Sequence, residues 1–537
     1  MKKYITWLLL TIAVWPLACA PEAVKTAIDA EKTYDVIVIG AGGGGLGAAA
    51  RLSLAGKRVL VLEQHHKVGG YMTAFERGDY TFEVSLHAMD GLDPGGLTNA
   101  AFRKLGILDR IKPVRLDPMY RACFPQMALD VPADIEQYRK LLKERFPGEA
   151  EGLDRLFAAL DRIDRAFAVG TKFIDGRFCG ALWEGVKHPR SLGTMLKYWD
   201  ATLSELLGDF IHDRQLISVF TQLSGFLGDG PDRISGLTFA AMWNSYHRHG
   251  YYYVQGGSQS VSDALAEVIR ENGGEIKTAV LVTKILVQDG RAVGVQTKDG
   301  GLFRGRRVIS NANAPDTLFK LVGREHLPES YAAKVAAMEI AAAAFVAYLG
   351  VDMDYSGHFP HHIHELMINK SADQAANYQP VGRDGLADAP YVITNYSMVD
   401  PATAPPGKNV ITLTTLLPYD WHNGWHEADG YDRYTAFKNS VAEELVRQAE
   451  VFLPDLRSHI EIMEVGSPRT MKHYTLNPGG SMLGWANTPG QSLFKRLPQE
   501  TPIENLWLAG AWTFPCGGQS AVIMSGVLAA ESVLKTL

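Results

Sequence analysis

The residues best suited to chemistry lie in one segment near the start of the chain, residues 34–63. Gly40, Gly42 and Gly45 match the pattern Gly-x-Gly-x-x-Gly, and Glu63 ends the apolar run that follows. In dinucleotide-binding folds the first glycine permits a tight turn, the second lets the backbone approach a pyrophosphate, and the third allows close helix packing. The acid accepts hydrogen bonds from ribose hydroxyls and would repel the 2′-phosphate of NADP. These residues therefore predict a site for NAD or FAD.

The elements needed to position these residues are predicted in the same segment. Residues 36–39 are a β-branched run typical of a buried parallel strand, and residues 59–62 predict a second strand. The small residues at 48–50 predict a helix between them, whose N-terminus would offer unpaired N–H groups to phosphates. The strand, the helix and the acid together favour a dinucleotide over a glycine-rich turn without a ligand.

Three separated segments resemble one family of flavoproteins. Gly69 and Gly70 open GGYMTAFERGDYTFEVSLHAMDG, residues 253–257 read YVQGG, and residues 504–534 read ENLWLAGAWTFPCGGQSAVIMSGVLAAESVL. Their order and spacing resemble the phytoene desaturase, carotenoid isomerase and retinol saturase superfamily, and most strongly its carotenoid isomerase and retinol saturase branch. The resemblance spans nearly the whole chain after its first residues and implies FAD as the cofactor.

The resemblance also implies which residues contact FAD. The glycine pair Gly69 and Gly70 would approach the flavin side of the dinucleotide, and a backbone contact to the adenine is expected near Val282. The C-terminal segment would lie against the ribityl and isoalloxazine parts, with its helix N-terminus directed at the edge where negative charge gathers on reduction. From that segment the resemblance implies contacts by Gly510, Ala511, Gly518 and Val522.

For the fold, the resemblance implies the α/β class, with a glutathione-reductase-like FAD-binding Rossmann domain and an α+β substrate domain made of a mixed sheet and a helical cap. The FAD domain is expected to combine residues 33–91, 251–320 and 466–537, and the substrate domain residues 92–250 and 321–465. Apolar spacing predicts helices over 153–167, 195–207 and 216–227, a helix ending at 341–345, and strands at 346–349 and 410–415. A substrate pocket is expected where the two domains meet.

The resemblance implies chemistry on the C=C bonds of an apolar polyene such as a carotenoid or retinoid. Saturation, desaturation and cis–trans isomerisation stay open, and the first two need a quinone or another redox partner. A polyene has no ionisable group, so its site needs apolar walls and few polar side chains. His87 matches by position a histidine of retinol-saturase-like members and is the candidate catalytic residue, as a proton donor. The alternative, a core histidine satisfied by backbone hydrogen bonds, stays open.

Two other functions remain possible at this point. A flavin amine oxidase shares the implied fold, but it would need an aromatic cage around an amine. A non-enzymatic lipid carrier of the Rab GDP-dissociation-inhibitor type also shares the fold without using FAD. Its dinucleotide fingerprint is degraded, whereas Gly40, Gly42, Gly45 and Glu63 are intact in this chain.

Composition excludes some further classes. The net charge of -6, without a basic patch interleaved with aromatic residues, gives no reason to expect nucleic-acid binding. The four cysteines are widely spaced, so they indicate neither a disulfide framework nor a zinc site. A histidine group, His358, His361, His362 and His364 beside Glu365, is better explained as a polar loop or strand edge than as a metal site.

The first twenty residues have the pattern of a bacterial export signal. Lys2 and Lys3 precede an apolar run over residues 5–17, which is short for a membrane span. Cys19 after Leu17 and Ala18 resembles a lipoprotein cleavage site, although Pro16 stands where leucine is expected. The segment predicts a membrane-associated, exported protein, as a lipoprotein or through a signal anchor. A cleaved soluble form and tethering at the cytoplasmic face stay open.

Overall fold

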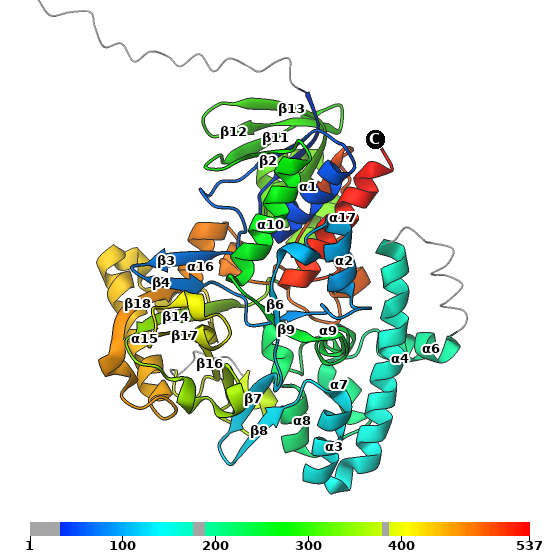
Figure 1. The fold of residues 1–537 in the computed structure, drawn as a ribbon. Coiled ribbons are helices and arrows are strands. Elements are labelled where there is room, and N and C mark those ends of the chain that lie inside the picture. Colours follow the sequence, from blue (N-terminus) through cyan, green and yellow to red (C-terminus); the bar gives the residue numbers. More distant parts are fainter. Residues whose placement is uncertain (1–32, 175–187, 379–385) are drawn as a thin grey trace, which may run out of the picture.

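The computed structural model describes residues 33–174, 188–378 and 386–537. Two large sheets lie toward different ends of the molecule (Figure 1). The first carries helices α1, α10 and α17, and a group of helices that includes α3, α4, α7 and α8 lies beside the second. The export-signal prediction for residues 1–20, including Cys19, lies outside the described residues, as does Cys179.

The first sheet is built mainly from parallel strands, in the order β10-β2-β1-β13-β12-β11, with β19 also paired to β13. Val36 pairs with Val59 on one side and Arg307 on the other, so β1 lies in the middle of the sheet. Central strands of a parallel sheet are covered on both faces, which explains the apolar runs of β1 and β2. The strands are β1 (Thr33–Ile39), β2 (Val59–Leu62), β10 (Glu275–Lys277), β11 (Val282–Gln288), β12 (Arg291–Thr297), β13 (Leu302–Ser310) and β19 (Leu506–Leu508).

Glycines allow the two helices next to this sheet, α1 (Gly43–Leu54) and α17 (Gln519–Leu534), to touch backbone to backbone. A Cβ added at Gly526 would lie 2.0 Å from the carbonyl oxygen of Gly44, and one at Gly47 would lie 2.8 Å from that of Ile523. Any larger residue would push the helices apart. A third helix, α10 (Gly257–Glu271), packs against α1.

The second sheet has the order β18-β14-β17-β16-β15-β7-β8 and is antiparallel except between β15 and β7. Helix α15 (Tyr431–Ala449) contributes Val441 and Leu445 to the apolar core on one face of this sheet, together with Phe345 and Leu349. The strands predicted at 346–349 and 410–415 are confirmed within β14 and β17. The strands are β7 (Tyr120–Phe124), β8 (Met127–Val131), β14 (Ala343–Val351), β15 (Glu365–Ile368), β16 (Tyr391–Asn395), β17 (Asn409–Leu417) and β18 (Ile460–Gly466).

The helical cap follows the predicted pattern only in part. The helix predicted over 153–167 is confirmed within α4 (Ala150–Ile174). The single helix predicted over 195–207 is wrong, because a capping box of Thr202 and Glu205 begins a new helix there. The helix predicted over 216–227 ends at Phe220 and continues as a 3-10 turn. The cap helices are α3 (Ile135–Arg145), α4, α6 (Pro189–Lys197), α7 (Leu203–Gly208), α8 (Arg214–Phe220) and α9 (Gly236–His249).

The helix predicted to end at residues 341–345 is also wrong. Helix α12 (Glu329–Ala336) ends earlier, and the alanines that follow enter β14, where Ala344 pairs with Leu416. Strand pairing and burial override the helix propensity of alanine there. Ala332 and Val335 of α12 pack in the core of the first sheet, so the boundary predicted at residue 321 falls inside that core.

Within the described ranges, no helix is both long and apolar enough to cross a membrane. The same ranges contain no group of three or more histidine, cysteine or acidic side chains placed to hold a metal ion. His358, His361 and His362 lie on short 3-10 turns, whereas His364 and Glu365 are buried at the start of β15.

His247 on α9 is an unusual residue of the cap core. Its side chain is buried, its ring lies 4.1 Å from Trp243 and 5.1 Å from Tyr138, and neither ring nitrogen has a hydrogen-bond partner in the described structure. Burial lowers the pKa of His247 to about 3. The folded protein therefore keeps this imidazole neutral at pH values where the unfolded chain protonates it.

We expect His247→Phe to remove part of the protein's acid sensitivity. Below pH 6.5 the unfolded chain gains a proton that the folded state does not accept until about pH 3, so stability falls as the pH falls. Between those values the loss is about 1.4 kcal/mol per pH unit, or roughly 2 kcal/mol at pH 5. Urea unfolding of the wild type and the variant at pH 7 and pH 5 measures this loss of stability. His326→Phe, at an exposed histidine, is the control, and equal pH dependence of both variants would contradict the prediction.

Candidate functional site

The turn between β1 and α1 forms one wall of a large cavity. Gly40 has φ +88°, a backbone conformation that favours glycine, and Gly42 is the residue before the helix. A Cβ at Gly45 would lie 2.0 Å from the carbonyl oxygen of Gly40, which explains the third glycine as a packing requirement. Gly42 and Gly43 present bare backbone to the cavity.

Glu63 lies at the end of β2 and faces the same cavity. The backbone N–H of Ala41 donates to its Oε2 (2.6 Å), and that of His65 donates to its Oε1 (2.8 Å). Burial raises the pKa of Glu63 and these backbone hydrogen bonds oppose the increase. The two hydrogen bonds fix the carboxylate beside the glycine turn.

Segments from the far ends of the sequence complete this end of the cavity. The N–H of Gly69 donates to the carbonyl of Ala41 (2.8 Å), and Gly510 has φ +97° with its N–H bonded to Ser525. Nine of the residues predicted to contact a dinucleotide line the cavity: Gly40, Gly42, Glu63, Gly69, Gly70, Val282, Ala511, Gly518 and Val522. The other two, Gly45 and Gly510, lie behind the lining in the close backbone contacts.

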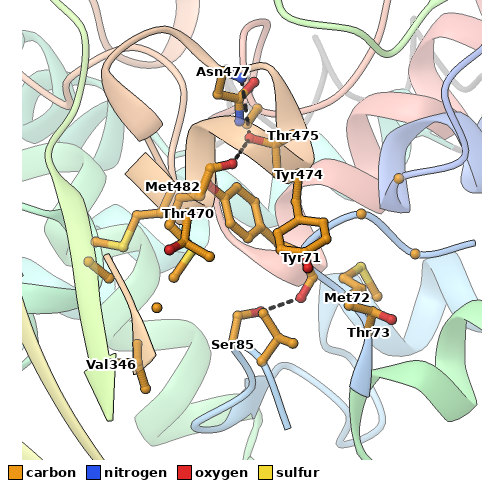
Figure 2. A pocket seen from close by; sticks show the side chains of 18 of the residues that line it. Tyr71, Met72, Thr73, Ser85, Val346, Thr470, Tyr474, Thr475, Asn477 and Met482 are labelled. Carbon is orange, nitrogen blue, oxygen red and sulfur yellow. Dashed lines mark hydrogen bonds between the residues drawn. The ribbon is translucent and has the colours of Figure 1, made fainter. Parts of the chain in front are cut away.

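The cavity has a volume of about 1740 Å³. Pockets for small molecules usually measure roughly 300–1,000 Å³, so this one has room for a dinucleotide and a second long molecule. In its wall, Ser85 Oγ donates to the carbonyl of Tyr71 (2.7 Å), with Met72 and Val346 nearby (Figure 2).

Beyond the glycine-rich end, one face of the second sheet forms the cavity floor. A row of directly paired residues crosses five strands, and all its members line the cavity. The row spans roughly 19 Å, because neighbouring strands lie about 4.8 Å apart. It carries no charged side chain. Its members are Gly466, Val346, Thr414, Val392 and Met367.

His87 lies on the loop between β4 (Tyr80–Glu83) and β5 (Met89–Asp90) and also lines the cavity. Its Nδ1 is 2.9 Å from Oε1 of Glu365, and its ring stacks against Phe226 at 5.8 Å. The Glu365 side chain is completely buried. Burial alone would raise the pKa of Glu365, but the His87 imidazole and the Tyr251 hydroxyl oppose it, and the net shift is downward.

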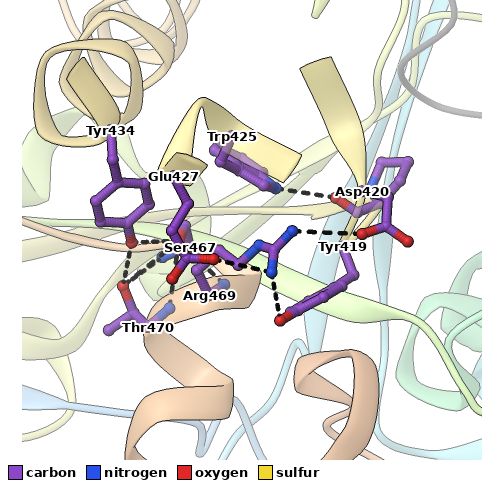
Figure 3. A network of polar contacts seen from close by, with 9 residues as sticks. Tyr419, Asp420, Trp425, Glu427, Tyr434, Ser467, Arg469 and Thr470 are labelled. Atoms are coloured by element: carbon purple, nitrogen blue, oxygen red, sulfur yellow. Dashed lines mark hydrogen bonds and ion pairs between the residues drawn. The ribbon is translucent and has the colours of Figure 1, made fainter. Parts of the chain in front are cut away.

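A polar network fixes one edge of the cavity (Figure 3). The Arg469 guanidinium lies 3.8 Å from the centre of the Tyr419 ring, donates to the Tyr419 hydroxyl and lies 2.9 Å from Glu427. The Tyr434 hydroxyl lies 2.7 Å from Oγ of Ser467, which caps helix α16 (Pro468–Thr475). The network ties α16 to residues 419–434.

Arg496 is a buried cation bonded mainly to backbone. Its guanidinium donates to the carbonyls of Leu483, Trp485 and Ala511, at 2.7–2.9 Å from Nη2. Burial lowers the pKa of Arg496 to about 10, so the side chain stays protonated at neutral pH. It holds together two stretches of cavity wall, since Leu483 and Ala511 both line the cavity.

Comparison with known proteins assigns this architecture to a family. The family model of flavin containing amine oxidoreductases matches residues 44–534, which is most of the chain. The chain belongs to the flavin containing amine oxidoreductase family. Membership of this family implies a flavin as the cofactor.

Curated relatives within this family act on carotenoids and retinoids, by their names. A prolycopene isomerase of Daucus carota is 27% identical over 94% of this chain and 81% of its own length. An all-trans-retinol 13,14-reductase of Homo sapiens is 27% identical over 97% of this chain and 90% of its own. A 4,4'-diapophytoene desaturase of Methylomonas sp is 25% identical, with 94% and 95% covered. The predicted resemblance is confirmed.

Solved structures confirm the predicted fold class. An oxidoreductase from Methanosarcina mazei has a TM-score of 0.61 at 18% identity, covering 93% of this chain and 99% of its own. A putrescine oxidase has a TM-score of 0.60 at 12% identity (94% and 99%), and a Rab GDI from Plasmodium falciparum 0.52 at 11% (94% and 98%). The fold is the α/β, glutathione-reductase-like flavin fold with an α+β substrate part.

The residues present fit a flavin dinucleotide. A Cβ at Gly42 would lie 2.7 Å from Oδ1 of Asn311, and one at Gly43 would lie 2.5 Å from the sulfur of Met72, so a side chain at either position would force these neighbours to move. Gln519, at the start of α17, lines the cavity and has a buried Oε1 without a hydrogen-bond partner in the described structure. An orphaned polar atom in a glycine-walled cavity is what a polar ligand would satisfy.

Arg496 was not predicted as a site residue, and Glu365 was named only beside a histidine group interpreted as a polar loop or strand edge. Each is a charged residue in an apolar stretch, Glu365 before Leu366, Met367 and Ile368, and Arg496 before Leu497. A charge at a position that must be buried signals a specific partner, and that signal was available in the sequence.

We expect Arg496→Met to destabilise the cavity wall. The substitution leaves three buried carbonyls without their donor, which costs about 1–3 kcal/mol for each group that water cannot reach. Thermal unfolding should occur at a lower temperature, and flavin occupancy should fall with it. Arg447→Met is the control, because Arg447 lies on the surface and its ion-pair partner among the described residues is Glu444. Equal Tm values for the two variants would contradict the prediction.

Proposed function

We propose that this protein is an FAD-dependent oxidoreductase that acts on C=C bonds of an apolar polyene, carotenoid or retinoid-like, by saturation, desaturation or cis–trans isomerisation. One observation carries the proposal: the glycine-walled end and the uncharged sheet floor belong to one continuous cavity. The first end suits a dinucleotide, and the floor of roughly 19 Å suits an extended apolar chain.

FAD would be held by the glycine turn at Gly40 and Gly42, the ribose acceptor Glu63, and the N-terminus of α17 at Gly518. When bound, the flavin exchanges a hydride at N5, so the cofactor supplies the redox step. The positive end of α17 would stabilise negative charge that gathers on the reduced flavin. The remaining task of the protein is to place the substrate and exclude water.

The floor supports a polyene over an amine as substrate. Val346, Val392 and Met367 offer apolar contact, and the row contains no carboxylate that could bind an ammonium group, whereas Glu427 and Glu464 line the cavity outside the row. His87 is the polar side chain that we assign to the substrate region. The names of the curated relatives support the same substrate class. A quinone or another redox partner would exchange electrons with the flavin in saturation or desaturation.

The purified protein should show a flavin absorption spectrum, and after anaerobic reduction it should convert members of a panel of retinol, carotenes and their cis isomers. Reoxidation of the flavin by a polyene would establish saturation, and rearrangement without reoxidation would establish isomerisation. Glu63→Arg should abolish flavin retention and turnover together, because a cation replaces the ribose acceptor. Glu144→Arg, at an exposed glutamate, should keep both.

Other outcomes of this experiment would replace the proposal. Flavin reduction by putrescine or aromatic amines, without any effect of polyenes, would identify an amine oxidase. Absence of flavin after reconstitution would favour a lipid carrier. Full flavin retention by Glu63→Arg would contradict the assignment of the dinucleotide site.

For localisation we propose a membrane-associated, exported protein, held by lipid on Cys19 or by the apolar run at residues 5–17. Such a position would suit a lipid-soluble substrate. Cys19→Ser should release the protein from membranes if lipid is the anchor, as measured by fractionation of the expressing cells. Membrane association that persists in this variant would indicate the apolar run, and protection from external protease in intact cells would indicate the cytoplasmic face.

A further inference from the structure

Glu365 carries a buried carboxylate whose partner is a histidine and not a lysine or arginine. Its side chain is fully buried on β15, and in the described chain no lysine or arginine lies within ion-pair distance of it. Its two oxygens face His87 Nδ1 at 2.9 Å and the hydroxyl of Tyr251 at 3.1 Å. An isolated ionised carboxylate in an apolar interior is costly, so the imidazole of His87 is its electrostatic partner.

The surrounding structure holds His87 in this position. The Tyr348 hydroxyl donates to the carbonyl of Val84 (3.2 Å), and a ring nitrogen of His364 lies 3.4 Å from the carbonyl of His87. Tyr348, Thr412, Thr394 and Glu365 form a second row of paired residues, next to the row that makes the cavity floor. The loop that carries His87 therefore lies over a polar row of the sheet.

This arrangement distinguishes the two nitrogens of the His87 ring. Nδ1 lies 2.9 Å from Oε1 of Glu365, an ion-pair contact without hydrogen-bond alignment, and 3.4 Å from Oγ1 of Thr394. Nε2 has no partner among the described residues and belongs to a side chain that lines the cavity and is 19% exposed. A carboxylate beside Nδ1 keeps the proton on that nitrogen and fixes the orientation of the ring. Nε2 is then the atom available to a substrate.

We propose that Glu365 is a positioning residue that keeps a proton on Nδ1 of His87 and presents Nε2 as the atom that exchanges a proton with a carbon of the substrate. The inference rests on the proposed function. In saturation an Nε2–H bond would break and a C–H bond would form at one carbon of the double bond, and the hydride for the other carbon would come from the reduced cofactor. Water then returns the proton to Nε2. Desaturation is the reverse, with Nε2 accepting the proton.

If the His87–Glu365 pair had only a structural role, variants of Glu365 would behave differently. If Glu365 only satisfied His87 in the core, its loss would lower stability and flavin retention together, without a selective effect on kcat. A positioning residue predicts a selective loss of turnover, since the loss of general acid–base catalysis costs on the order of 10²-fold or more. The orientation of the imidazole is also measurable without any substrate.

The test uses the full-length flavin-loaded protein with Glu365→Gln and Glu365→Asp. We expect Gln to lower kcat about 100-fold on the polyene turned over by the wild type, with a small change in KM and an unchanged flavin spectrum. Asp keeps the carboxylate and should restore part of kcat. NMR of ¹⁵N-labelled histidine should show the Nδ1–H form of His87 in the wild type and its loss in the Gln variant.

Asp130→Asn is the matched control, because Asp130 pairs with Nδ1 of His361 at 2.6 Å, away from the cavity lining. It should change the His361 signal and leave that of His87 and kcat unchanged. His87→Gly gives an independent measurement that does not depend on the folding of Glu365 variants. It should retain flavin, lose turnover and recover it on addition of imidazole, which can enter through the cavity.

Wild-type kcat in Glu365→Gln, or an unchanged Nδ1–H signal of His87, would overturn the inference and leave the proposed function intact. Failure of imidazole to restore turnover in a flavin-loaded His87→Gly would also overturn it. Absence of polyene turnover in the wild type would overturn both proposals. The NMR signals would then show whether the pair has a purely structural role.

Discussion

Contact of backbone with backbone at glycines is the constraint on which the site depends. Helices α1 and α17 approach so closely that a Cβ at Gly526 would lie 2.0 Å from the carbonyl oxygen of Gly44. This contact brings the N-terminal ends of both helices to one cavity, although they come from opposite ends of the sequence (Figure 1). The positive ends of two helix dipoles are thereby directed at the same cavity.

Buried charged side chains then connect the cavity walls to the helices of the first sheet. Glu83 accepts the backbone N–H groups of Ser85, Leu86 and Ser258, so it joins the loop before His87 to the first turn of α10. Glu365 holds the same loop from the second sheet. Because burial leaves these carboxylates no water to bind, their positions are restricted to geometries that supply donors. The loop is fixed from both sides by the same physical requirement.

Elements whose structure depends on residues close together in the sequence are predicted well. Strands β1 and β2 and helix α1 contain the residues predicted for them, because glycine spacing and apolar runs are local signals. A helix is predicted to end at residues 341–345, but strand β14 begins at Ala343, since pairing with β17 outweighs alanine's propensity. The His87–Glu365 contact joins distant segments, and no local pattern specifies such a partner. The charge of Glu365 in an apolar run signals a partner but not its identity.

The cavity is consistent with all three reactions of the proposed function for a physical reason. The floor row from Gly466 to Met367 recognises length and apolarity, which a polyene and its more or less saturated forms share. Nε2 of His87 can both donate a proton to the substrate and accept one from it, because the forward and reverse steps use the same contact. The direction of net chemistry is then determined by the electron donor or acceptor that meets the flavin. Isomerisation involves no net electron transfer, so in that reaction Nε2 would return to the substrate the proton that it takes.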